Sequence, residues 1–413
     1  MKQAVSADGR GREQDGPAVW TRSFLLFFTA RSVSMLGAAM VPFATAVGVG
    51  GLGYGSTGVG LALAAWMAPF AVLILFGGVF ADRFTPRRMM IGADTVRVVS
   101  QGTAAALFVF GRPDLWQILV ISAINGVAAA MYQPGVSSTV PRVARDVQKA
   151  NATLRVSESI MLLAGPGVAG AIVGFSGVGV VFAIDAAGFT VSAVCLLLLR
   201  LPVVAGPVAE RSMWRNLREG WQEFRSRTWM WSVILVWAVF GVTLFGPMIP
   251  LGSVLISERL GETAYGLVMS ASGAGTIVGG LVAMRVRPGR PLMAGAIGLF
   301  GFALEPLSIA VASPPAVLMA AHVIGGAGWA FWSVMWATSI QTQVPAEALN
   351  RVTAYEVAGS TLFVPVGQVL AGPVAGLVGA PQLLAGSSIV AVAGCAALLL
   401  IPAVRGLRRV SSA

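Results

Sequence analysis

The residues best suited to do chemistry in this chain are ionisable side chains that stand alone inside long apolar segments. Arg31, Glu158 and Glu356 are of this kind, as is the only histidine, His322. An isolated charge at the centre of a bilayer costs about 2.5–3.5 kcal/mol on insertion scales, so such groups face a bundle interior or a water-filled cavity. We therefore expect Arg31 to pair with Glu158 or Glu356.

Two of these carboxylates, Glu158 and Glu356, are also candidates for carrying a proton. A carboxyl group that is buried without a partner gains or loses a proton as its surroundings change. The alternative is a purely structural pair within one part of the bundle. His322 titrates near neutral pH, although a hydrogen-bonded packing role is favoured for it, as is a structural role for Asp185 and Glu305.

Other kinds of chemistry find little support in the sequence. Cys195 and Cys395 lie inside apolar blocks, and with one histidine they are too few for a metal cluster or a disulfide framework. None of the glycine-rich stretches continues into the Gly-Lys-Ser or Gly-Lys-Thr of a phosphate-binding loop. We therefore expect no enzyme activity, no metal and no cofactor.

The elements that carry these side chains are expected to be membrane-spanning helices. Of the 413 residues 56% are hydrophobic and 11% are charged, and the mean hydropathy is +0.80, whereas soluble domains carry about 25% charged residues. Apolar blocks of about 20 residues are long enough to cross a bilayer as helices. The expected spans are residues 22–49, 57–80, 89–110, 114–138, 152–174, 178–200, 229–256, 265–284, 291–311, 316–340, 352–377 and 382–403.

Positive charge is distributed as in membrane proteins rather than as in nucleic-acid-binding proteins. The formal net charge is +11, and most of the 28 Lys and Arg residues fall in loops on one side of the expected spans. Such loops stay in the cytoplasm. We therefore expect a multi-pass protein with both termini in the cytoplasm, surrounded by lipid and without a nucleic-acid partner.

An internal repeat divides the expected spans into two halves. Residues 77–88 and 279–290 are identical at six of twelve positions. Halves in parallel order pack about an axis along the membrane normal and hold a site near the midplane between them. The expected fold is an all-α integral membrane protein with twelve transmembrane helices in two six-helix halves.

The same pattern gives the expected organisation of the chain. The connection between the halves carries Trp214, Leu217, Trp221 and Phe224 at helical spacing, which is typical of a helix in the headgroup region. The expected parts are a disordered cytoplasmic N-terminus (1–19), a first half (20–200), a cytoplasmic linker with an amphipathic helix (201–228), a second half (229–404) and a cytoplasmic C-terminus (405–413).

The first copy of the repeat resembles the inner-loop signature of the major facilitator superfamily. The residues that match are Gly78, Asp82, Arg83, Arg87 and Arg88. The chain is most similar to the bacterial branch that contains the enterobactin exporter and macrolide efflux proteins. That branch carries Ser-x-x-Gly in its first span and Asp-x-x-Arg at the start of its third, and the matching residues here are Ser34, Gly37, Asp94 and Arg97.

Two positions depart from the pattern of the superfamily. Ser122 stands where many proton-coupled drug exporters of the superfamily carry an Arg. The antiporter signature of the fifth span is matched only in part, by Gly165, Pro166 and Gly170. Both departures speak against proton antiport by the usual route of those exporters.

The resemblance also implies roles for particular residues. Gly78, Asp82, Arg83, Arg87 and Arg88 would form a latch whose contacts exist in only one conformation, with a static topology anchor as the alternative. Asp94 and Arg97 would form a structural pair because residues three apart share a helix face. Spans one, four, seven and ten line the cavity of such transporters, which implies substrate contacts for Asn125, Gln133, Trp237, Trp332 and Trp336.

The function that the resemblance implies is secondary active export of small amphipathic or hydrophobic compounds, such as a drug, a siderophore or a secondary metabolite. We expect alternating access, the proton gradient as the driving force, a monomer, and the bacterial cytoplasmic membrane as the location. Aromatic walls with few charges suit a bulky, apolar or weakly cationic molecule. The alternatives are an importer of a small nutrient and a membrane sensor or scaffold that does not transport.

Overall fold

The computed structural model describes residues 20–74, 85–144, 147–199 and 213–409, and this part of the chain is helical without strands. The elements are α1 (Arg22–Val49), η1 (Gly50–Tyr54), α2 (Gly55–Ile74), α4 (Pro86–Phe110), α5 (Leu115–Val143), α6 (Val147–Ser176), α7 (Val178–Leu198), α8 (Met213–Arg225), α9 (Thr228–Phe240), η2 (Gly241–Phe245), α10 (Gly246–Leu260), α11 (Glu262–Arg285), α12 (Pro291–Leu299), η3 (Phe300–Ala303), α13 (Leu304–Ala310), α14 (Pro315–Gln343), α15 (Ala346–Thr361), α16 (Val364–Val378), α17 (Ala380–Leu400) and α18 (Pro402–Arg405).

Short polar residues set where the first helices begin. The Thr21 hydroxyl accepts a hydrogen bond from the backbone N–H of Phe24 at 3.1 Å and donates one to the carbonyl of Val143 at 3.1 Å. It therefore caps α1 and ties it to the end of α5. α5 begins after a capping box of Asp114 and Gln117, in which each side chain satisfies a backbone N–H of the first turn.

Ten helical stretches of the described chain are long and apolar enough to cross a membrane. The first, Arg22–Leu73, contains two of the expected spans, which meet at η1, where Gly53 has a φ of 88°. α4 is not among the ten, because it carries Arg87, Asp94 and Arg97. The all-helical membrane fold is therefore confirmed, and the number of twelve spans stays a prediction.

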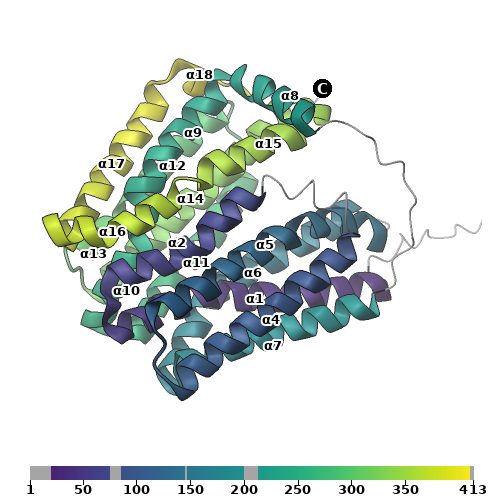
Figure 1. The fold of residues 1–413 in the computed structure, drawn as a ribbon. Coiled ribbons are helices and arrows are strands. Elements are labelled where there is room, and N and C mark those ends of the chain that lie inside the picture. The colour runs from purple at the N-terminus through teal and green to yellow at the C-terminus, as the bar shows by residue number, and fades with distance from the viewer. Residues whose placement is uncertain (1–19, 75–84, 145–146, 200–212, 410–413) are drawn as a thin grey trace, which may run out of the picture.

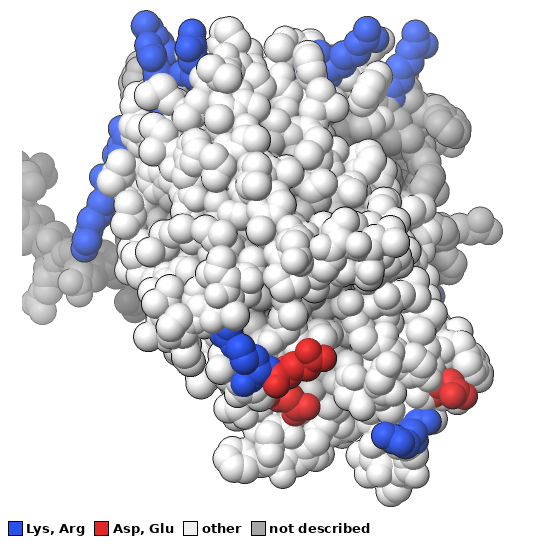
Figure 2. Space-filling model, turned by 90° about the vertical axis from the view of Figure 1, so that its left-hand side faces the viewer, with Lys and Arg blue, Asp and Glu red and all other residues white. Residues whose placement is uncertain are grey.

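The surface agrees with a protein that sits in lipid. On the face shown in Figure 2, Lys and Arg side chains gather at the upper edge, and a few charged side chains of both signs lie towards the lower end. The surface between them is almost uncharged. Many of its large side chains are exposed hydrophobics, of which Phe110, Phe175 and Leu377 are the most open, as expected where lipid replaces water.

The helices form two groups. Figure 1 shows α1 and α4 to α7, in purple to teal, mainly in the lower part, and α9, α12 and α14 to α18, in teal to yellow, in the upper part, with α2 and α11 between them. The groups contact each other chiefly through α2 with α16 and through α6 with α11. Each group has a hydrophobic cluster of its own, and that of the second group includes Trp237, Trp332 and Trp336. A further cluster spans both groups and contains Phe43 and Tyr265.

Glycines bring the two groups together at the end of the bundle that holds η1, hereafter the η1 end. A Cβ atom added to Gly60 of α2 would overlap the carbonyl oxygen of Gln368 in α16. Gly170 of α6 and Gly266 of α11 meet backbone to backbone, so a Cβ on either would lie 3.0 Å from the Cα of the other. Such small residues let membrane helices approach closely, and they close the halves on each other at this end.

The segment between the halves contains the helix α8. Its Phe224 is buried, and Trp221 is exposed by 48% while its ring lies 5.7 Å from that of Tyr355 in α15. α8 therefore packs on α15 and leaves Trp221 partly open, as expected for a helix with one apolar face.

Candidate functional site

A cavity of about 410 Å³ lies between the two halves, hereafter the central cavity. From the first half it is lined by α1, α2, α4, α5 and α6, and from the second half by Ile249, Tyr265 and Met269. At the η1 end it is narrowed by Phe43 of α1 and Tyr265 of α11, whose rings stack with centroids 5.0 Å apart. The stacked pair joins the two halves across the cavity wall.

The wall of the central cavity is mostly apolar, with five aromatic side chains and a few strong donors. Trp66 and Phe70 of α2 stack at 5.3 Å and face the cavity together with Tyr132 of α5. The donors include the amide of Gln133 and two guanidinium groups. Such a mixture holds a bulky apolar ligand and fixes its orientation through a few polar contacts. The cavity-lining charges are those of Arg31 and Arg97, and the lining includes no carboxylate from the described residues.

Arg31 and Glu158 form a salt bridge beside this wall. The Nη2 and Nε atoms of Arg31 donate to Oε1 of Glu158 at 2.9 and 3.1 Å, and both side chains are largely buried. A hydrogen bond between Ser32 and Ser157, with oxygens 2.7 Å apart, joins the same two helices next to the pair. The structure thus brings together one of the two pairs that the sequence suggested, across α1 and α6.

Asp94 and Arg97 do not form the direct pair expected of them. Oδ2 of Asp94 accepts a hydrogen bond from the hydroxyl of Ser192 at 2.6 Å. The Arg97 guanidinium lies over the rings of Tyr132 at 5.3 Å and Phe189 at 4.8 Å. The two charges still attract each other, but no hydrogen bond joins them, because partners from α5 and α7 hold the two side chains and cation–π contacts hold the guanidinium.

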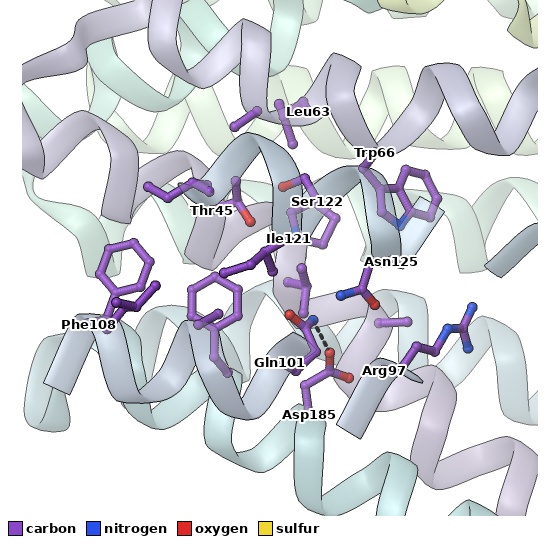
Figure 3. A pocket seen from close by; sticks show the side chains of 18 of the residues that line it. Thr45, Leu63, Trp66, Arg97, Gln101, Phe108, Ile121, Ser122, Asn125 and Asp185 are labelled. Carbon is purple, nitrogen blue, oxygen red and sulfur yellow. Dashed lines mark hydrogen bonds between the residues drawn. The ribbon is translucent and has the colours of Figure 1, made fainter. Parts of the chain in front are cut away.

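A smaller pocket of about 100 Å³, hereafter the side chamber, lies within the first half (Figure 3). It is bounded by α1, α2, α4, α5 and α7, and it shares Trp66 and Arg97 with the central cavity. Its polar side holds Asp185, which accepts a hydrogen bond from the amide of Gln101 at 2.5 Å. Asn125 also lines it and donates to the Ser100 hydroxyl at 2.8 Å.

The three tryptophans expected to touch substrate lie elsewhere. Trp237, Trp332 and Trp336 are exposed by 6, 1 and 9% and belong to the core of the second half. The rings of Trp237 and Trp332 are 5.2 Å apart, and those of Trp332 and Trp336 are 6.0 Å apart. The expectation that they line the cavity is wrong for this structure, because these wide rings bury their surface against one another.

Glu356 and His322 are also separate from the central cavity. Glu356 accepts hydrogen bonds from the Trp336 indole at 3.0 Å and from Ser360 at 3.4 Å. His322 is fully buried, and its Nδ1 lies 2.8 Å from the carbonyl oxygen of Leu318. Its Nε2 has no hydrogen-bond partner among the described residues. Both side chains therefore contact their own half, and neither meets Arg31.

The latch residues are only partly visible. Gly78, Asp82 and Arg83 lie outside the described residues. Arg87 donates from Nε and Nη2 to the carbonyl oxygens of Leu196 and Leu197 at 2.7 and 2.6 Å, and Arg88 is exposed. Arg87 therefore caps the last turn of α7, which is a contact inside the first half.

Several residues at the site were missed by the sequence reasoning. Trp66, Phe70 and Tyr132 carry no charge that marks them in an apolar span, and their place on the cavity wall depends on how the helices rotate. Gln101 lies one turn after Arg97 on α4, and this spacing was a usable signal for a shared face. Among the described residues no cluster of His, Cys, Asp or Glu could hold a metal ion.

The chain is similar to known transporters over nearly its whole length. It is 24% identical to the MFS-type transporter YvqJ of Bacillus subtilis over 94% of each chain. It is 20% identical to the macrolide efflux protein A of Streptococcus pyogenes over 91% of this chain and 95% of that protein. With the enterobactin exporter EntS of Citrobacter koseri it shares 23% identity over 85% of this chain and 84% of that one.

Solved structures agree on the fold. The crystal structure of the nucleoside transporter NupG superposes with a TM-score of 0.71 at 13% identity over 91% of this chain and 98% of that one. A bacterial homologue of the human lysosomal transporter Spinster, in an inward-facing and unoccupied conformation, gives a TM-score of 0.68 at 14% identity over 95% of this chain and 98% of that one. The family model of the Major Facilitator Superfamily matches residues 23–355, and the chain therefore belongs to that superfamily of membrane transporters.

Proposed function

We propose that this transporter exports small amphipathic compounds across the bacterial cytoplasmic membrane by alternating access. The observation that carries the proposal is the central cavity, which is closed at the η1 end by Gly60, Gly170 and Gly266 and is walled by aromatic rings. With both termini in the cytoplasm, η1 is outside, and the closed end faces away from the cytoplasm. This is the state in which an exporter loads its substrate from inside the cell.

The charges on the cavity wall favour one class of substrate. Arg31 and Arg97 both line the central cavity, and a guanidinium attracts carboxylate, phenolate and carbonyl oxygens. A neutral or anionic amphipathic molecule therefore fits better than the weakly cationic one that the sequence suggested. Relatives named for macrolide and enterobactin efflux support substrates of this size, with wide apolar faces and many oxygens.

Protons are the proposed driving ion, with Glu158 as one acceptor. Its salt bridge to Arg31 holds the guanidinium beside the central cavity. A proton on Glu158 removes the partner charge, and Arg31 is then free to hold an anionic group of the substrate. Glu356 is the corresponding acceptor proposed for the second half, where loss of its charge weakens the hydrogen bond from Trp336. The protein acts as a monomer in this scheme.

Flux measurements in proteoliposomes test this function. Enterobactin and erythromycin serve as anionic and weakly basic probes under an imposed pH gradient. We expect enterobactin to move faster than erythromycin, and Glu158→Gln or Glu356→Gln to abolish the part of the flux that the gradient drives. Arg225→Gln is the control, because Arg225 is exposed and lies outside the cavity lining. Equal fluxes in wild type and both glutamine variants at every pH contradict the proton role, and no flux of either probe contradicts export of this class.

A further inference from the structure

The side chamber contains a buried carboxylate that the proposed transport route leaves unused. Asp185 is exposed by only 1%, and its Oδ2 atom accepts the hydrogen bond from Gln101. Its second oxygen, Oδ1, has no hydrogen-bond partner among the described residues. Figure 3 shows the Asp185 side chain reaching into the chamber from α7. A buried, half-satisfied carboxylate beside an internal space is costly unless water or a proton completes its bonding.

The absence of a side chain at Gly37 of α1 makes room for the Asp185 carboxylate. Gly37 of α1 lies directly against it, and a Cβ atom at that position would overlap Oδ1 of Asp185. A chamber of about 100 Å³ has room for several water molecules. Gln101, Asn125 and Ser122 give such water polar partners on the wall. The chamber wall is mostly apolar, but these groups let water stand beside the Asp185 carboxyl, and a small rotation of that side chain brings Oδ1, which is covered in this structure, into contact with the water.

Of the charged and titratable side chains in this region, Arg97 of α4 lines the side chamber together with Asp185. The others lie at or beside the central cavity, namely Arg31 of α1 with its partner Glu158, Tyr132 of α5, and Asp94, which is bonded to Ser192. Arg97 is the group common to both spaces, because it lines the side chamber and the central cavity alike. Its Nε atom, like Oδ1 of Asp185, has no hydrogen-bond partner among the described residues. In Figure 3 its guanidinium points away from Asp185.

We propose that Asp185 binds and releases a proton in the side chamber and that Arg97 transmits its charge state to the central cavity. The proton passes from chamber water to Oδ1, where an O–H bond forms, and it returns to water on release. When Asp185 is ionised, it attracts the guanidinium of Arg97 towards the chamber. When Asp185 is neutral, Arg97 stays against Tyr132 and offers its charge to substrate. This coupling rests on the proposed export function.

A proton fits the chamber better than a sodium ion. The guanidinium of Arg97 already brings a permanent positive charge to the same wall. A second permanent cation there meets repulsion that is strong in a water-poor interior, whereas a proton simply neutralises Asp185. The hydrogen bond from Gln101 already occupies one lone pair of Oδ2, whereas Oδ1 has no hydrogen-bond partner among the described residues. A single proton on Oδ1 completes the bonding of this carboxyl group.

Infrared difference spectroscopy of the purified protein in liposomes tests this inference without any substrate. We expect the carbonyl stretch of a protonated carboxylic acid to appear as the pH falls, to vanish in Asp185→Asn, and to shift in frequency in Gln101→Leu, which removes the hydrogen bond to Oδ2. Glu305→Gln is the matched control, because Glu305 is a similarly buried acid, 4% exposed, in the second half. The Asp185 band is expected to persist in this control and in Glu158→Gln.

Three results overturn the inference. One is a band that is the same in Asp185→Asn as in wild type, another is an Asp185 band that is present at every pH, and the third is a band that Na⁺ removes at constant pH. The transport proposal is tested apart from it. If wild type moves neither enterobactin nor erythromycin, export of this class fails while the band still reports on Asp185. If the flux persists and the band is absent, the Asp185 assignment alone fails.

Discussion

At the scale of single residues, the salt bridge between Arg31 and Glu158 joins α1 to α6 beside the central cavity. The pair is largely buried, with two hydrogen bonds to one carboxylate oxygen. Each ion loses hydration on burial that the bonds to its partner offset, so removing one member of the pair costs stability. The alignment of α1 with α6 and the position of the guanidinium at the cavity wall follow from this pair.

Arg31→Met is expected to lower the free energy of unfolding by about 3 kcal/mol, because Glu158 then stays buried without its cation. Most of the loss is expected to return in the double variant Arg31→Met/Glu158→Gln, in which neither charge remains. Thermal unfolding followed by tryptophan fluorescence measures both. Arg227→Ala is the control, because its pair with Glu223 is partly exposed and is worth at most about 1 kcal/mol. A double variant no more stable than Arg31→Met contradicts this explanation.

The sequence predicted the partner of a charged side chain only where few partners were possible. Arg31 and Glu158 are isolated in apolar spans and had few possible partners, so their pairing was among those expected. Asp94 had another acceptable donor in Ser192, and Arg97 had two rings to lie against. The rotation of α4 and α7 about their own axes decides which of these partners each side chain meets. That rotation cannot be predicted from a single sequence.

At the scale of elements, the contact between α4 and α7 shows how polar residues fix the end of a helix. The last carbonyl groups of an α-helix lack partners within the helix. Arg87 of α4 satisfies two of them at the end of α7, at Leu196 and Leu197. Hydrophobic spacing predicted both helices, since it depends only on local composition. The Arg87 guanidinium, which joins the two helices, was predicted to be part of a latch. That prediction followed the inner-loop signature of the superfamily, which gives no information about a contact with α7.

Arg87→Ala is therefore expected to lower the free energy of unfolding by about 1.5 kcal/mol, the lower end of the range for hydrogen bonds from a charged donor. Arg88→Ala is the matched control, since Arg88 is the adjacent exposed residue, and it is expected to change stability little. Hydrogen exchange should show faster exchange in the last turn of α7 only for the Arg87 variant. Equal stability in the two variants contradicts the capping role.

At the scale of the whole molecule, the relation between the halves determines which side of the membrane the cavity meets. The internal repeat predicted that a site lies between two halves, because symmetry alone requires it. It did not predict which side is closed, since both states of a transporter share one sequence. The structure shows the halves touching at the η1 end, where Gly60 lies against Gln368.

Gly60→Ala is expected to disfavour this state, because the added methyl group overlaps the Gln368 carbonyl. Gly280→Ala is the matched control, since a Cβ there meets no atom of the described residues within 4 Å. In a Cys195→Ser/Cys395→Ser background, Ile249→Cys reports on the central cavity. A membrane-impermeant thiol reagent added on the η1 side is expected to label that cysteine faster with Gly60→Ala than with Gly280→Ala. Equal labelling rates contradict the idea that close packing at Gly60 stabilises this state.

Gly170 and Gly266 have a further consequence for how this protein changes over generations. Where two side chains crowd each other, a gain in size on one is usually offset by a loss on its neighbour. Here both residues are glycines without a side chain, so neither can become smaller to make room for a larger residue opposite it. Because the nearest atom is backbone, a larger residue at either position shifts α6 relative to α11 by a few tenths of an ångström and loosens the contact between the halves at the η1 end.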